Sequence, residues 1–296
     1  MTPRASRDRL LDLRTRLQVR AQQPLAGRVP ICIGAVCVGS AAPEVARYVA
    51  AQVPGFVVTL ADRAATPPHY PAPWPQASEP RLQWAQVPDT VAARSAALDH
   101  AAQALRAAGL LGGWRDEQLD VRAADDMRGA STPLATIERA ACRPLGITTF
   151  ALHLNAFLPD GRLWIAQRAA HKAIDPGCWD SLVGGMQAAG ETERQTLERE
   201  AAEEAGLALA ALALVPCGRV IMRRPVPEGW QAEVIAAFNA TLAQDIVPVN
   251  QDGEVQRIEA ASVDRVLGML EDGAFSLEAA LVTIDGLLQH ADTWRS

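Results

Sequence analysis

The first part of the chain alternates short apolar segments with longer segments that suit helices. Short apolar runs bounded by glycine or proline are typical of strands, whereas segments that begin at proline or a capping residue and end at glycine are typical of helices. The predicted strands are 30–38, 56–60 and 119–122, and the predicted helices are 4–20, 43–53 and 90–108. The proline-rich segment 66–80 predicts an extended loop. A small α+β unit is therefore expected.

The second part of the chain predicts a larger unit with more strands. A polar, turn-rich segment at 125–131 marks the expected boundary between an N-terminal unit, 1–131, and a second unit, 132–296. The predicted strands are 147–158, 162–168, 216–223 and 232–240, and the predicted helices are 192–205, 263–270 and 277–290. The turn Pro159-Asp160-Gly161 joins the first two of these strands into a hairpin.

The composition narrows the classes of partner. The 296 residues are 49% hydrophobic and 21% charged, with a formal net charge of −6 and no basic stripe. A protein with this charge repels polyanions, so a nucleic-acid polymer is not an expected partner. No segment reaches the roughly 18 apolar residues of a membrane span, so no membrane partner is expected. The five cysteines lack C-x-x-C spacing, which indicates thiols in a reducing compartment. A cytoplasmic protein is expected, and a homodimer is left open.

The segment from Gly185 to Leu207 carries an unusual concentration of acid. It contains six glutamates and two arginines. Glu200, Glu203 and Glu204 stand at i, i+3 and i+4, so their carboxylates project from one side of the predicted helix. Like charges at this spacing destabilise a helix, and the helix dipole disfavours anions in its last turns. A bound cation explains such a cluster better than a solvated helix face does, and hard oxygen ligands suit Mg²⁺.

The fixed positions of this segment (GMQAAGETERQTLEREAAEEAGL) resemble the complete signature of the Nudix hydrolase family, the Nudix box. The resemblance implies a Nudix α/β/α sandwich with a mixed sheet from about residue 132 onward. A smaller α+β domain would precede the sandwich and border the substrate pocket. The activity implied is the metal-dependent hydrolysis of a diphosphate bond in a small molecule.

The resemblance also assigns roles within the box. The implied metal ligands for Mg²⁺, with Mn²⁺ as the alternative ion, are Glu200, Glu203, Glu204 and the backbone carbonyl of Gly185. Glu191 and Arg199 would form a structural ion pair that fixes the loop to the helix, and Gly206 would end the helix. A carboxylate must accept a proton from the attacking water. The candidates are the three box glutamates and Glu254, which follows Asp252-Gly253 in a predicted turn.

A narrower resemblance covers most of the chain. The segment 171–185 (HKAIDPGCWDSLVGG) looks like the segment before the box in Nudix proteins related to the N-terminal part of fungal thiamine pyrophosphokinase. Segments 94–98 and 113–117, with Val121, are similar to the domain that precedes Nudix in that subfamily. This resemblance implies hydrolysis of thiamine diphosphate, or of its oxidised analogues, to the monophosphate.

These segments supply candidate substrate-binding residues, each with a structural alternative. Arg168 and Lys172 could contact the diphosphate or lie at the surface. Trp114 and Trp179 could stack on a substrate ring or fill the core. Arg115 could contact the substrate or pair with a neighbouring carboxylate. The segment 225–230 is also expected to border the pocket.

Three other functions compete with this hypothesis. Isopentenyl-diphosphate isomerase has a similar segment before the box, but its chemistry needs a cysteine in a Cys-His-Pro setting. The segment 179–185 has no cysteine, and no histidine follows Cys178. A catalytically inactive Nudix sensor is expected to lose box carboxylates, and all of them are present here. A nucleoside diphosphate derivative, such as a sugar nucleotide, ADP-ribose or an oxidised nucleotide, is the second choice of substrate.

Overall fold

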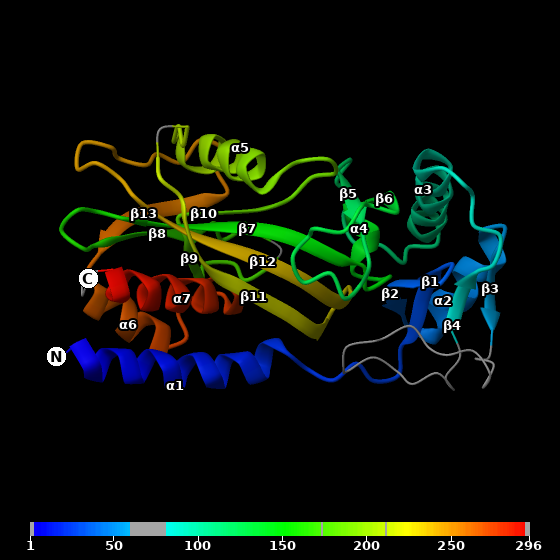
Figure 1. Cartoon of the computed structure of the whole chain (residues 1–296), viewed down its shortest axis with the longest axis horizontal. Helices are drawn as coiled ribbons and strands as arrows, with labels where there is room; N and C mark the ends of the chain where they lie inside the picture. Colours follow the sequence, from blue (N-terminus) through cyan, green and yellow to red (C-terminus); the bar gives the residue numbers. More distant parts are fainter. Residues whose placement is uncertain (1–2, 60–80, 173, 211, 294–296) are drawn as a thin grey trace.

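The computed structural model describes residues 3–59, 81–172, 174–210 and 212–293, so the predicted loop at 66–80 lies outside the described residues. Figure 1 shows two units that lie end to end, each with its own sheet and helices. The N-terminal unit contains a four-stranded sheet, and the C-terminal unit contains a seven-stranded sheet. The first helix of the chain, α1 (Pro3–Ala21), packs on the C-terminal unit beside the last helix, α7 (Leu277–Thr293).

The N-terminal unit is an α+β arrangement. Its sheet has the order β2-β1-β4-β3, in which β1 and β4 run parallel and the other neighbours are antiparallel. The strands are β1 (Val29–Ile33), β2 (Val36–Ala41), β3 (Phe56–Thr59) and β4 (Arg81–Trp84). The helices are α2 (Pro43–Gln52) and α3 (Val91–Ala107), and Thr90 caps α3 by accepting the Ala93 N–H. A two-stranded sheet, β5 (Gln118–Val121) with β6 (Ala135–Glu138), and the short helix α4 (Arg139–Cys142) pack against this unit.

The prediction of one strand over 30–38 is wrong, because the chain reverses within this run. Gly34 has a φ of +59°, which glycine adopts without a steric penalty, and it opens the turn between β1 and β2. Ile33 pairs with Val36 on either side of that turn. Both strands are almost wholly buried, so no polar residues interrupt the apolar run and mark the turn.

The C-terminal unit confirms the expected α/β/α sandwich with a mixed sheet. The strand order is β11-β12-β7-β8-β13, while β10 pairs with β7 and β9 pairs with β8. The strands are β7 (Thr148–Phe157), β8 (Leu163–Arg168), β9 (Trp179–Ser181), β10 (Val183–Met186), β11 (Val215–Val226), β12 (Gly229–Thr241) and β13 (Val255–Ala261). Helix α5 (Glu193–Ala205) covers one face, and α1, α6 (Val263–Glu271) and α7 cover the other (Figure 1). The sequence pattern does not predict β9, β10 and β13, because these strands are short, rich in glycine or charged at an edge.

The central strand β7 is buried at every one of its positions. Leu152, Leu154 and Ala156 pack with α5, whereas Ala151 and Phe157 pack with α1 and α7. Coverage on both faces explains why apolar residues point to both faces and do not alternate with exposed polar ones. β7 also runs parallel to β12, which places the start of β12 beside the start of β7.

Backbone contacts hold the units together near the starts of β7 and β12. The Trp230 N–H donates to the Arg143 carbonyl at 2.9 Å, and the Ala189 N–H of the box loop donates to the Gln118 carbonyl at 2.8 Å. Gly229 lies directly against this junction with a φ of +140°. A Cβ on Gly229 would overlap the Arg143 carbonyl oxygen, so only glycine allows the hairpin of β11 and β12 to approach α4 this closely.

Gly229→Ala should therefore destabilise the protein by about 1–3 kcal/mol. Alanine is strained at this positive φ, and its Cβ would push the hairpin of β11 and β12 away from α4. The free energy of unfolding in urea measures the loss. Gly109→Ala is the matched control, since Gly109 also has a positive φ, +69°, but open space around its Cβ position. An equal loss in both variants would show that the contact with Arg143 contributes nothing.

Candidate active site

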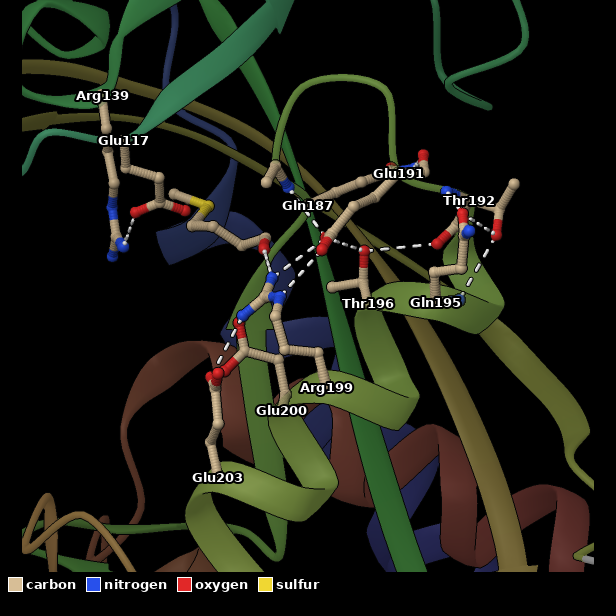
Figure 2. Close-up of polar contacts among 12 residues, drawn as sticks. Glu117, Arg139, Gln187, Glu191, Thr192, Gln195, Thr196, Arg199, Glu200 and Glu203 are labelled. Carbon is tan, nitrogen blue, oxygen red and sulfur yellow. Dashed lines mark hydrogen bonds and ion pairs between the residues drawn. The ribbon is translucent and has the colours of Figure 1, made fainter. Parts of the chain in front are cut away.

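Arg199 joins the loop before α5 to the helix itself. Its Nε donates to Glu191 Oε1 at 2.8 Å, and its Nη2 donates to Glu191 Oε2 at 3.0 Å and to the Met186 carbonyl at 3.1 Å. Figure 2 shows the guanidinium between Glu191 on one side and two box glutamates on the other. Thr192 caps the helix, and its side chain and that of Gln195 form a reciprocal capping box. The loop and the first turns of α5 thus form one rigid piece.

Glu191 is held in its ionised form by these contacts. Thr196 Oγ1 donates to Glu191 Oε2 at 2.7 Å, and the Ala188 N–H donates to the same oxygen at 3.2 Å. The hydrogen bonds from Arg199, acting against burial and supported by those of Thr196 and Ala188, lower the pKa of Glu191 to about 2. The geometry is that of a structural ion pair, the role that the sequence suggests for Glu191 and Arg199.

Glu200 and Glu203 lie on the free side of the Arg199 guanidinium. Arg199 Nη1 donates to Glu200 Oε1 at 2.8 Å and to Glu203 Oε2 at 3.3 Å. The Glu200 side chain packs so closely on Gly185 that a Cβ on this glycine would overlap the carboxyl group. Burial raises the pKa of Glu200, although Arg199 acts in the opposite direction. Glu203 is 56% exposed, so it is open to solvent and to a ligand.

Glu204 turns toward a different set of acidic residues. Its Oε2 accepts the Gly184 N–H at 2.9 Å, and burial raises its pKa well above the ordinary value. One carboxylate oxygen each from Glu204, Asp252 and Glu254 lies within 4.8 Å of the others. We call these three residues the acidic cluster. Sequence reasoning singled out Glu254 but missed Asp252, although both flank Gly253 in the same turn.

The acidic cluster fits a hard divalent cation. Carboxylate oxygens gathered this closely are the hard ligands that Mg²⁺ and similar cations prefer, so Glu204, Asp252 and Glu254 would hold such an ion. Lys172 Nζ already contacts Glu254 Oε2, so a cationic group occupies one side of the cluster. Burial opposes the ionisation of Glu254, but the hydrogen bond and charge of Lys172 outweigh it and lower the pKa. The cluster would hold the ion together with water and substrate oxygens, and Glu200 and Glu203 stand on the same helix.

Two adjoining cavities of about 150 Å³ each lie between the N-terminal unit and the large sheet. The inner cavity is lined by Gly112, Gly113 and Arg115 of the N-terminal unit and by Trp230 of β12, from the predicted segment 225–230. The outer cavity reaches Gly184 and Gly185. A small cavity of about 20 Å³, which contains Glu204 and Glu254, shares Arg168, Asp180 and Gly184 with the outer one. The three cavities therefore adjoin through shared lining residues and form a row, here called the cavity path, from the acidic cluster to the N-terminal unit.

Arginines line the middle of this path. Arg139 and Arg143 border both larger cavities, and Arg168 borders the outer one. Arg139 Nη1 donates to Glu117 Oε2 at 2.6 Å, a pair drawn in Figure 2, and Arg143 Nη1 lies 3.4 Å from Glu228 Oε2. Sequence reasoning missed Arg139 and Arg143, which stand in and just after the short helix α4. Their only signal was the cluster of basic residues before a predicted strand.

The proposed substrate residues fall into two groups. Arg168 and Lys172 border the cavities, and Arg168 Nη1 donates to Asp180 Oδ2 at 3.0 Å. Arg115 also borders the inner cavity. Trp179 lies in the main core, and Arg257 covers its ring at 5.8 Å. The Trp114 indole donates to Asp116 at 2.6 Å and packs under Arg106. These contacts favour the structural alternative for both tryptophans.

Comparison with known proteins agrees with this geometry. The NUDIX domain matches residues 151–281, and a domain of unknown function, DUF4743, matches residues 15–149. An uncharacterised Nudix hydrolase of Pseudomonas aeruginosa is 34% identical over 44% of this chain and 68% of its own length. The chain belongs to the Nudix hydrolase family.

Two further relatives match different shares of the chain. Nudix hydrolase 24, chloroplastic, of Arabidopsis thaliana is 31% identical over 67% of this chain and 54% of its own length. This chain thus spans about half the length of the plant relative. Isopentenyl-diphosphate Delta-isomerase of Leifsonia xyli is 32% identical over 39% of this chain and 64% of its own length. Among the described helices, none is long and apolar enough to cross a membrane.

Asp252→Asn should weaken the binding of a divalent ion by roughly 10-fold or more, because the variant removes one charged oxygen ligand from the acidic cluster. Calorimetric titration with Mn²⁺ measures the dissociation constant without requiring turnover. Asp245→Asn, at an exposed position nearby in the sequence, is the control. Unchanged Mn²⁺ affinity in Asp252→Asn would remove Asp252 from the metal site.

Glu191→Gln should lose less stability than the wild type when the pH falls. The pKa of Glu191 is lowered from 4.5 to about 2, so its contribution is complete above the higher value and disappears as the pH approaches the lower one. Between about pH 5.5 and pH 3.5, the difference in unfolding free energy between the two proteins should shrink by roughly 1 kcal/mol. Urea titrations at both pH values measure it. Glu193→Gln, which loses one surface contact to Arg219, is the control, and the same pH response in all three proteins would contradict the assignment.

Proposed function

We propose that this protein hydrolyses a diphosphate bond in a small molecule with the help of a bound divalent ion. One observation carries the proposal: the acidic cluster lies beside arginine-lined cavities that extend to the N-terminal unit. Mg²⁺ is the proposed ion, with Mn²⁺ as the alternative, and Glu200, Glu203, Glu204 and the Gly185 carbonyl are proposed ligands together with Asp252 and Glu254. The chain's membership in the Nudix hydrolase family supports the same reaction class.

The residues of this chain have separate tasks in the proposed reaction. A bound Mg²⁺ would offset the charge that develops on the phosphate oxygens. Arg139, Arg143 and Arg168 would hold the diphosphate, since guanidinium groups match phosphate oxygens in geometry and charge. Glu254, or one of the box glutamates, would accept the proton of the attacking water. Lys172, beside Glu254, would keep that carboxylate in place until the substrate arrives.

Thiamine diphosphate, or an oxidised analogue that is cut to the monophosphate, is the proposed substrate. Two of the segments that resemble thiamine-related Nudix proteins border the same cavities. Gly113 and Arg115 come from segment 113–117, and Ile174 and Asp175 come from segment 171–185. A nucleoside diphosphate derivative is the second candidate. The domain boundary near residue 131, the cytoplasmic location and a homodimer stay predictions.

Two other activities are less well supported. The relative named as an isomerase raises that possibility, but residues 179–185 contain no cysteine, and Cys178 is followed by Trp179. Burial also raises the pKa of the Cys178 thiol, which disfavours the thiolate. A sensor without catalysis is disfavoured because Glu200, Glu203 and Glu204 are all present.

The release of a phosphate-containing product should depend on Mg²⁺ and on the box glutamates. The panel comprises thiamine diphosphate, its oxo and oxy analogues, ADP-ribose, sugar nucleotides and oxidised dGTP. The double variant Glu203→Gln/Glu204→Gln should lose roughly 100-fold or more in kcat, because it removes charge that holds the ion at the reacting phosphate.

The double variant Glu193→Gln/Glu198→Gln changes two exposed glutamates of the same helix and is the matched control. It should retain the activity of the wild type. Binding of a panel compound without any product release by the wild type would contradict hydrolysis and favour the sensor. The preferred compound would decide between thiamine and nucleotide substrates.

A further inference from the structure

One buried carboxyl in the cavity path lacks the partners that its neighbours have. Glu233 stands on β12 opposite Thr149 of β7, and it borders both larger cavities. It is 7% exposed. Thr149 Oγ1 donates to Glu233 Oε2 at 3.1 Å. Within the described parts of the chain, no lysine, arginine or histidine forms an ion pair with this carboxyl.

The buried carboxyl of Glu278, on the wall of the outer cavity, is compensated by a cation: it accepts from Gln231 Nε2 at 2.9 Å and pairs with Arg224 at 3.2 Å. Glu138, which does not line the cavities, has two backbone donors on Oε1, the N–H groups of Arg115 at 2.9 Å and Ala140 at 3.2 Å, while its Oε2 has no partner among the described residues. A buried carboxyl group without a cation or several donors destabilises the folded state. The position of Glu233 is therefore better explained by a ligand than by folding.

The residues around Glu233 indicate which chemical groups its ligand would carry. Cys142, Ile147, Ile174, Met186 and Trp230 give the inner cavity apolar walls, which suit a flat organic ring. Arg139 and Arg143 line the same two cavities as Glu233. The charges of Glu233 and Glu200 both act to raise the pKa of Arg139, so this guanidinium lies within electrostatic range of both carboxyls. A diphosphate held by the arginines would leave its organic group within reach of Glu233.

We propose that Glu233 recognises an amino-substituted nitrogen heterocycle at the organic end of the substrate. This inference rests on the proposed function, because it assumes that the diphosphate lies along the arginines. The carboxyl would accept an N–H from the amino group or exchange a hydrogen bond with a ring nitrogen. Burial and the charge of Glu278 raise the pKa of Glu233, against the effects of Arg143, Thr149 and Arg139, so a proton can be shared with a ring nitrogen. Thr149 would orient the carboxyl.

The test compares Glu233→Gln and Glu233→Leu with the wild type, using thiamine diphosphate and ADP-ribose as amino-heterocyclic probes and isopentenyl diphosphate as a probe without nitrogen. Glu233→Gln should raise KM for the first two by about 10-fold and Glu233→Leu by about 100-fold, with kcat within about threefold. KM for isopentenyl diphosphate should not change. Glu271→Gln, at the surface of α6, is the control.

A stability measurement separates recognition from folding. Removal of an uncompensated buried charge should leave Tm unchanged or raise it, so a fall in Tm for Glu233→Gln together with unchanged KM would overturn the proposal. An equal rise in KM for all three probes would also overturn it. Since Gln matches Glu in shape, this variant remains informative if Glu233→Leu fails to fold.

A binding measurement distinguishes failure of this inference from failure of the proposed function. Calorimetry with thiamine monophosphate and AMP, without a divalent ion, measures affinity for the organic end alone. The wild type could hydrolyse no compound and still bind either probe about 10-fold more tightly than Glu233→Gln does. That result would contradict the proposed hydrolysis and support the proposed recognition by Glu233. If the wild type hydrolyses the panel and Glu233→Gln matches it in KM and in affinity, recognition fails and hydrolysis stands.

Discussion

The fork of hydrogen bonds from Arg199 holds together groups that would otherwise repel one another. One planar guanidinium contacts Glu191, Glu200, Glu203 and the carbonyl of Met186. A lysine could not reproduce this set, because its ammonium is a compact charge without the fixed geometry of the fork. The contacts fix the loop from Met186 to Glu191 against α5. They also offset part of the repulsion among carboxylates that lie near the negative end of the helix dipole.

Two glycines allow the close contacts around these glutamates. Glu200 can lie against the backbone at Gly185 because that residue has no side chain, and Gly206 ends α5 with a φ of +64° beside Gln251. The same turn carries Asp252 and Glu254 toward Glu204. The helix end and the distant turn thus meet through a glycine, and the acidic cluster forms from two segments that are far apart in the sequence.

Some contacts of the site lie within one segment, whereas others join segments that are far apart in the sequence. This difference decides how much of the site could be predicted from the sequence. The box residues lie within one loop and one helix, so fixed spacing predicted their relative positions. Asp252, Arg139 and Glu233 depend on which turn meets α5 and on which strand pairs with β7, and no local pattern contains that information. The fold follows the same rule. The longer strands of the second unit were predictable from their apolar runs, and the resemblance of the box implied their arrangement as an α/β/α sandwich, whereas the hairpin at Gly34 was hidden because both of its strands are buried.

The position of the cavities indicates where substrate selectivity is encoded. In the proposed reaction the acidic cluster and the arginines would contact phosphate, which every diphosphate presents, so they would not distinguish one substrate from another. The groups that differ among diphosphates would lie against Trp230, Glu233 and the segment at Gly112, which come from both units. Family membership therefore fixes the reaction class but not the substrate. A strongly selective site needs buried polar groups that the wrong substrate leaves unpaired, and the buried carboxyl of Glu233, which accepts from the hydroxyl of Thr149 and lines both larger cavities, would serve as such a group.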